Sequence, residues 1–144
     1  PAPELLELAD KMGILILDEV FDRWASGKNE NDYAVHYSEW HKKDIEALVC
    51  RDRNHPSVIM WSLGNEVEEQ YHPEKGVAAY LRDIVRLYDS TRPVTFGASY
   101  PSKSAINGTE LQVDVHGMNY PSGGYGGAGF FLKFFYFFLY NFSF

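Results

Sequence analysis

The chain has 144 residues, of which 45% are hydrophobic and 23% charged, a composition typical of a folded globular protein rather than a disordered one. The formal net charge of -7 argues against nucleic acid as a partner, because phosphate binding needs a clustered basic surface. A single cysteine, Cys50, cannot form an internal disulfide, so the compartment stays open, and the sequence is compatible with a secreted or periplasmic parent protein.

A helix is expected first, between Pro3 in its first turn and Gly13 at its C-cap. The apolar residues that recur there at helical spacing are Leu5, Leu8, Ala9 and Met12. The continuous apolar run of residues 14–17 follows and predicts a short strand buried on both faces. The acidic pair Asp18-Glu19 lies at the carboxyl end of this strand.

A second helix is predicted at residues 37–51, followed by turn residues and a buried strand at residues 58–63. This strand leads into Gly64-Asn65-Glu66, so a carboxylate again follows a strand. The clearest helical periodicity then runs from His72-Pro73 to Tyr88. Two further strands are expected at residues 93–96 and 113–116, the second closing on Gly117-Met118-Asn119-Tyr120.

Alternating helices and buried strands predict an α/β fold with a parallel sheet. A doubly wound sheet usually carries a glycine-rich phosphate-binding turn after its first strand, and no such motif occurs here. A (β/α)8 TIM barrel instead gathers its functional residues at the carboxyl ends of several strands. The polar residues expected at those ends are Asp18, Glu19, Asn65, Glu66, Asn119 and Tyr120.

Glu66 has the chemistry of a general acid, because a carboxyl group that points from a strand end into a pocket is partly desolvated and holds a proton more readily. The side-chain amide of Asn65 can donate a hydrogen bond to a sugar hydroxyl beside the scissile bond. Taken alone, such a dipeptide is more often a solvated loop or a helix N-cap.

The run from Arg51 to Val58 and the run Trp61-Ser62-Leu63-Gly64-Asn65-Glu66 resemble the acid/base signature of glycoside hydrolase family 2. The resemblance covers about residues 1–121 and implies part of a TIM barrel, about strands 3 to 6. It implies that Glu66 is the general acid/base and that Asn65 contacts the sugar 2-hydroxyl. Tyr120 resembles the tyrosine that bonds the nucleophile.

In this family the nucleophilic glutamate lies on the seventh barrel strand, for which the chain offers no counterpart. A retaining mechanism needs two carboxyl groups about 5–5.5 Å apart. Glu68, Glu69 and Glu110 are rejected as substitutes because none ends a separate later strand. The chain is therefore expected to be a fragment that is inactive alone.

Three further residues are candidates for the substrate site. The resemblance places Asp18 and Glu19 at the end of the third barrel strand, where they line the pocket or hold basic side chains. Trp24 offers a face on which a sugar ring can stack, although a lone loop tryptophan more often packs inside. In magnesium-dependent relatives a carboxylate and a histidine follow the acidic pair, but Arg23 and Ala25 stand there, so no metal is expected.

The expected parent is a β-galactosidase-like enzyme that hydrolyses terminal β-linked sugars with retention, needs no cofactor, and takes a carbohydrate substrate. β-Glucuronidase and β-mannosidase specificities stay open. So does a truncated, non-catalytic remnant with at most weak sugar binding. The resemblance also implies that the chain lacks half of the barrel and the flanking β-sandwich domains of its parent.

The sequence changes character after residue 121, where a glycine-rich stretch precedes a tail that holds eight of the 10 phenylalanines. The alternative for this tail is a membrane anchor, but the tail is short for a span of about 20 residues and contains Lys133. Residues 122–144 are therefore expected to be a non-native or disordered tail, and no membrane partner is predicted.

Overall fold

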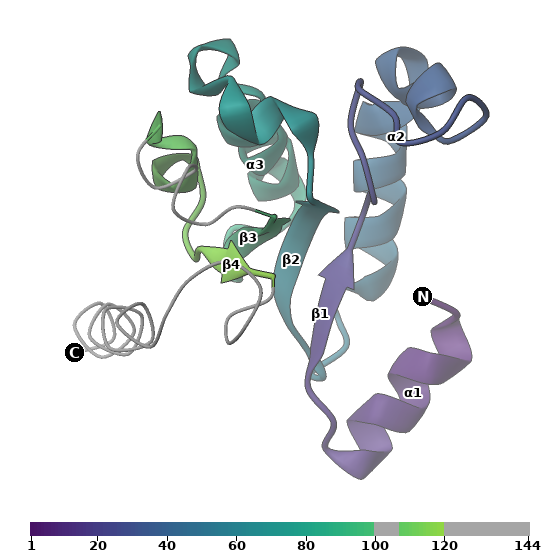
Figure 1. The fold of residues 1–144 in the computed structure, drawn as a ribbon. Coiled ribbons are helices and arrows are strands. Elements are labelled where there is room, and N and C mark those ends of the chain that lie inside the picture. Colours follow the sequence, from purple (N-terminus) through teal and green to yellow (C-terminus); the bar gives the residue numbers. More distant parts are fainter. Residues whose placement is uncertain (100–106, 120–144) are drawn as a thin grey trace.

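The computed structural model describes residues 1–99 and 107–119, in which four parallel strands alternate with three α-helices (Figure 1). In chain order the elements are α1 (Pro3–Met12), β1 (Ile16–Glu19), α2 (Ala34–Asp52), β2 (Val58–Asn65), α3 (Val77–Tyr88), β3 (Val94–Ala98) and β4 (Gly117–Met118). Short 3-10 helices lie at Glu68–Tyr71, Pro73–Lys75 and Thr109–Gln112. The predicted α/β fold with a parallel sheet is confirmed.

The strands are ordered β1-β2-β3-β4, so each strand pairs with the next one along the chain. Asp18 and Glu19 of β1 lie opposite Trp61 and Ser62 of β2. The far end of β2 reaches further, with Asn65 opposite Gly97 of β3, and Gly97 in turn opposite Gly117 of β4. The carboxyl ends of β2, β3 and β4 therefore lie side by side at the same end of the sheet.

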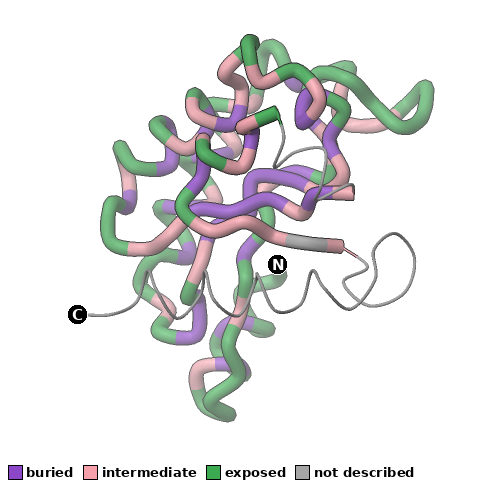
Figure 2. The backbone as a smooth tube through the Cα atoms, turned by 60° about the vertical axis from the view of Figure 1, so that its left-hand side comes forward, coloured by how far each residue is buried: buried purple, intermediate pink, exposed green. Residues whose placement is uncertain are grey.

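The core fills the space between the sheet and the helices α2 and α3, which contact each other (Figure 1). Burial is densest along the central strands (Figure 2). Trp61, Leu63 and Phe96 from the strands are fully buried, as are Leu81 and Val85 of α3. Trp61 also donates its indole N–H to Asp89 at the end of α3, 3.0 Å away, which ties helix and strand together.

The first helix begins and ends as its sequence predicts. Pro3 stands in the first turn of α1, and Gly13 at the C-cap has a φ of 71° and donates its N–H to Ala9 O. Within the described ranges, no helix is long and apolar enough to cross a bilayer.

The first strand differs from its prediction in position and in burial. β1 begins two residues later than expected, at Ile16, and includes the acidic pair Asp18-Glu19. The apolar residues before and within it are not buried on both faces, since Leu15 is 65% exposed and Leu17 55% exposed. In the described part of the chain, helices cover one face of this strand, so the apolar side chains of the other face remain open.

Two other boundaries also shift. The long helix predicted from His72-Pro73 is interrupted by Gly76, whose φ of 61° separates a short 3-10 turn from α3. The strand predicted at residues 113–116 is a bend, in which the N–H groups of Asp114 and Val115 both donate to Val94 O. A strand ladder cannot form with one acceptor serving two donors, so β4 begins only at Gly117.

Candidate functional site

Glu66 follows β2 directly and has the backbone of a turn. Its φ is 53°, and among the described residues it is the one non-glycine with a positive φ. Its N–H donates to Gly97 O of β3 over 2.7 Å, so the turn is anchored to the neighbouring strand. A side-chain-bearing residue pays about 1–3 kcal/mol for this conformation, and such outliers concentrate at functional sites.

Asn119, just past β4, connects to the end of β2 through its side-chain amide. Its Nδ2 donates to Glu66 Oε1 over 3.0 Å and to Asn65 Oδ1 over 2.7 Å. Its backbone N–H donates to Ala98 O over 3.1 Å, which fixes it at the same end of the sheet. Residues from β2, β3 and β4 therefore converge around one half-buried carboxylate.

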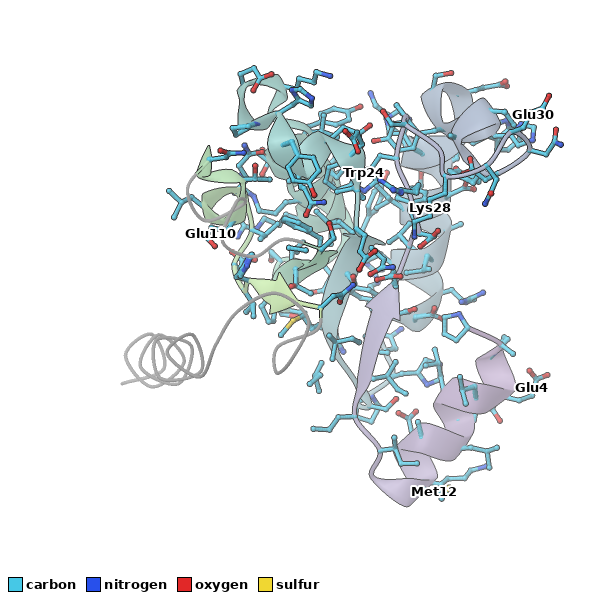
Figure 3. The ribbon with its side chains drawn as sticks, in the orientation of Figure 1. Glu4, Met12, Trp24, Lys28, Glu30 and Glu110 are labelled. Carbon is cyan, nitrogen blue, oxygen red and sulfur yellow. The ribbon has the colours of Figure 1, made fainter. Side chains whose placement is uncertain are left out.

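The loop after β1 reaches this cluster from the other side. The backbone N–H of Asn65 donates to Asp22 O over 2.9 Å. The side-chain Nδ2 of Asn65 lies 3.4 Å from Asp22 Oδ1. Lys28 forms an ion pair with the same carboxylate oxygen over 2.7 Å. In Figure 3 Lys28 lies on the sheet side of this loop, whereas Glu30 is at its outer tip.

Gly97 makes the approach of the two asparagines possible. A Cβ atom placed on Gly97 would lie 3.0 Å from Asn65 Oδ1 and 3.1 Å from Asn119 Oδ1. These separations are tighter than ordinary contacts, so any side chain there would push the amides aside. The requirement is for space and not for a special φ.

The two members of the predicted acidic pair point in opposite directions. Glu19 is exposed and accepts a hydrogen bond from Ser62 Oγ over 2.7 Å. Successive side chains of a strand alternate between its faces, so Asp18 points toward the helices. It is 1% exposed and lies near Asp52 of α2.

The sequence left two roles open for Asp18, lining the pocket or holding basic side chains, and its burial near Asp52 and Arg51 favours the second. Burial, together with the nearby carboxyl group of Asp52, raises the pKa of Asp18 to about 7. Asp52 is itself buried, and its pKa is lowered by two hydrogen bonds of 2.6 Å from Arg51, which outweigh that burial. Asp18 therefore belongs to the contact between β1 and α2.

The sequence left two roles open for Trp24, a stacking face for a sugar ring or packing inside the fold, and its burial favours packing. It is fully buried, and its indole N–H donates to Leu63 O of β2 over 2.8 Å. Its ring meets Phe96 edge-on, with centroids 6.2 Å apart. Figure 3 places it between the loop and the end of β2. No face is open to a ligand.

The remaining candidates lie elsewhere. Tyr120 is outside the described residues. Glu68 is exposed on its 3-10 turn, and Glu69 is buried and accepts the N–H of Ser26. Glu110 lies 3.4 Å from His116, and burial raises the pKa of its carboxyl group. In the parts of the chain that the structure describes, no three His, Cys, Asp or Glu residues are grouped to hold a metal ion.

The sequence pattern marked Asn119 as a strand-end residue but assigned it no role. Gly97, Asp22 and Lys28 were not selected at all. The position of Asn119 beside Tyr120 was the one available signal, since a polar residue that ends a barrel strand points toward the site. The contribution of Gly97 is an absence of side chain, which residue chemistry does not reveal.

Parallel strands that alternate with helices, with polar residues gathered at their carboxyl ends, define the class of β/α barrel domains. The family model "Glycosyl hydrolases family 2, TIM barrel domain" matches residues 1–125. The chain belongs to this family, as part of its barrel domain.

The relatives agree with this assignment. A β-galactosidase of Bacteroides ovatus, BoGH2A, is 37% identical over 152 residues, covering 83% of this chain and 18% of that protein. The human β-glucuronidase is 34% identical over 100 residues, covering 66% of this chain and 14% of that protein. A crystal structure of a family 2 member from Bacteroides cellulosilyticus superimposes with a TM-score of 0.78 at 40% identity, covering 83% of this chain and 16% of the other. The chain thus spans less than a fifth of the length of these relatives.

Proposed function

We propose that this chain is part of a retaining glycoside hydrolase that cleaves terminal β-linked sugars, with Glu66 as its general acid/base. One observation carries the proposal. A half-buried glutamate ends a barrel strand in a left-handed turn, and a hydrogen bond to the next strand and another to Asn119 hold it there. Such a fixed carboxyl group suits proton transfer, because general acid/base catalysis depends first on geometry.

The proposed reaction has two steps. In the first, the Glu66 carboxyl group gives its proton to the glycosidic oxygen, the bond from the anomeric carbon to that oxygen breaks, and a second carboxylate attacks the anomeric carbon. In the second, Glu66 accepts a proton from water as the water oxygen attacks the anomeric carbon, the bond from that carbon to the second carboxylate breaks, and the sugar is released. The second carboxylate is not assigned to a residue of this chain.

Asn65 and Glu19 complete the proposed site. The Nδ2 group of Asn65 has two N–H bonds, and one is directed to Asp22 at the long distance of 3.4 Å. The other can donate to the sugar 2-hydroxyl, a contact that strengthens in the transition state. Glu19 is an exposed carboxylate next to Ser62 and can accept from sugar hydroxyls. Tyr120 stays a prediction based on the resemblance.

The sugar is proposed to be a β-galactoside. The name of the Bacteroides ovatus relative supports this class, while several other relatives are named β-glucuronidases. Relative kcat/KM values on aryl β-galactosides, β-glucuronides and β-mannosides would decide, with the galactoside expected to be the best substrate. A preference for the glucuronide would overturn this sugar assignment without affecting the role of Glu66.

The role of Glu66 is tested with Glu66→Ala in the full-length enzyme that carries this segment. Loss of the acid should lower kcat/KM by about 10²–10⁴-fold for substrates with poor leaving groups, and far less for activated aryl glycosides. The matched control is Glu68→Ala, two residues along and exposed. Equal losses for both kinds of leaving group, or equal losses in the two variants, would contradict the assignment.

The 144-residue chain by itself is proposed to be inactive, because one of the two carboxylates is not among its assigned residues. An assay of this chain on the same aryl glycosides is expected to give no turnover above buffer. Turnover that Glu66→Ala abolishes would show instead that the chain contains both carboxylates.

A further inference from the structure

The side-chain amides near Glu66 form a row with one possible orientation. The carboxylate of Asp22 only accepts hydrogen bonds, so Asn65 must turn its Nδ2 toward it. This turns Asn65 Oδ1 toward Asn119, which must then present its own Nδ2. The same Nδ2 also faces Glu66 Oε1, another acceptor. Each group therefore fixes the orientation of the next.

Both N–H bonds of Asn119 Nδ2 are used inside the site, one on Asn65 and one on Glu66. This amide group therefore has no N–H left to donate to a sugar. Its hydrogen bond to Glu66 Oε1, 3.0 Å long, fixes the orientation of that carboxyl group. It also leaves Oε2 as the oxygen that exchanges the proton with substrate and water.

We infer that Asn119 is a positioning residue for Glu66, and that Gly97 leaves the space in which Asn119 and Asn65 meet. The inference rests on the proposed function of Glu66 and adds to it the residue that selects its reacting oxygen. Without Asn119 the carboxyl group can rotate about its side-chain bonds, so its reacting oxygen is placed less accurately. The effect should fall on kcat rather than on KM.

The test uses Asn119→Asp and Asn119→Leu in the full-length enzyme. A carboxylate next to Glu66 disfavours a second charge, and a leucine removes the donor, so both changes should favour the protonated form. The alkaline limb of kcat/KM against pH is expected to move to higher pH, by more in Asn119→Asp than in Asn119→Leu. We expect kcat for poor leaving groups to fall about tenfold or more, with little change in KM.

The control is Asn54→Asp, which makes the same chemical change at an exposed residue in the turn before β2. Gly97→Ala keeps Asn119 but crowds both amide oxygens, and it should also lower kcat. The inference is overturned if the two Asn119 variants keep the alkaline limb of the control, or move it to lower pH, while Glu66→Ala still shows its loss. If Glu66→Ala shows no loss, the proposed function itself fails.

Discussion

Glu66 and Asn119 show how few contacts are needed to fix one carboxyl group. Two hydrogen bonds act on Glu66: its backbone N–H donates to Gly97 O, and its side-chain Oε1 accepts from Asn119 Nδ2. The strain of a left-handed glutamate, about 1–3 kcal/mol, persists because β3 holds the turn in place. These contacts join residues more than 30 positions apart, which only the folded sheet brings together.

A second residue-scale feature is the buried acid pair of Asp18 and Asp52. Asp18 has a raised pKa of about 7, so its favourable contribution to folding is complete below about pH 4 and is lost as the pH rises toward 7. Asp52 has a lowered pKa, so its contribution is present above about pH 4 and is lost in acid. The Arg51 guanidinium also acts on the pair and favours its charged form.

Asp18→Asn is expected to remove the first of these effects. An amide cannot ionise, so the variant should gain stability relative to the unchanged protein as the pH rises from 5 to 8, by on the order of a few kcal/mol. Urea unfolding at several pH values measures the difference. Parallel curves of unfolding free energy against pH for the two proteins would refute the pairing.

The roles of Glu66 and Asn65 were predicted from the resemblance of a long, specific run of neighbours to the family signature, since residue chemistry alone favours a solvated loop or a helix N-cap. For Asp18 and Trp24 the sequence left a substrate contact and a structural role both open, because the deciding fact is which face of the chain a side chain occupies. Asp18 and Glu19 are adjacent and acidic, yet one is buried against α2 and the other is open. Neighbouring residues of a strand point to opposite faces, and the composition of the strand does not show which face each residue occupies.

At the scale of elements, β2 was predicted well because it is a mostly apolar run, with Val58, Trp61 and Leu63 buried, and turn residues bound it. The weaker predictions concern strands whose ends depend on partners. β1 begins late because pairing with β2 starts only at Ile16, and β4 is limited to Gly117–Met118 because the segment before it bonds to Val94. Strand limits of this kind follow from tertiary pairing rather than from local propensity.

Trp24 links the loop after β1 to β2, and Trp24→Phe tests this link. Phenylalanine fills most of the space but lacks the indole N–H, so Leu63 O loses its side-chain partner. We expect a loss of about 1–3 kcal/mol in unfolding free energy. Thermal unfolding of the variant provides the measurement, and KM for substrate should change little. A raised KM with unchanged stability would restore Trp24 as a substrate contact.

At the scale of the whole molecule, the described residues form an open sheet with β1 at one edge. Leu15 and Leu17 of this edge region are more than half exposed. An edge strand with exposed apolar residues is a template for pairing with another chain. In a complete barrel no such edge exists, because the sheet closes on itself.

The 144-residue chain is therefore expected to self-associate, and Leu17→Lys should reduce this. A charge on an edge strand opposes pairing between chains. Light scattering coupled to size-exclusion chromatography would compare the two proteins at equal concentration, with Leu111→Lys, an exposed residue away from β1, as control. If Leu17→Lys and the control associate equally, the edge of β1 is not responsible.

The central claim is that Glu66 is the acid/base of a retaining glycosidase, and the most direct measurement is the product that Glu66→Ala forms in the presence of azide. Azide needs no general base, so it should restore turnover of an activated aryl β-glycoside and give a β-glycosyl azide, whose anomeric configuration NMR reports. An α-configured azide would show a single direct displacement, as expected if residue 66 were the nucleophile, and would contradict the acid/base assignment. Failure of azide to raise the rate, with the variant correctly folded, would contradict the assignment of Glu66.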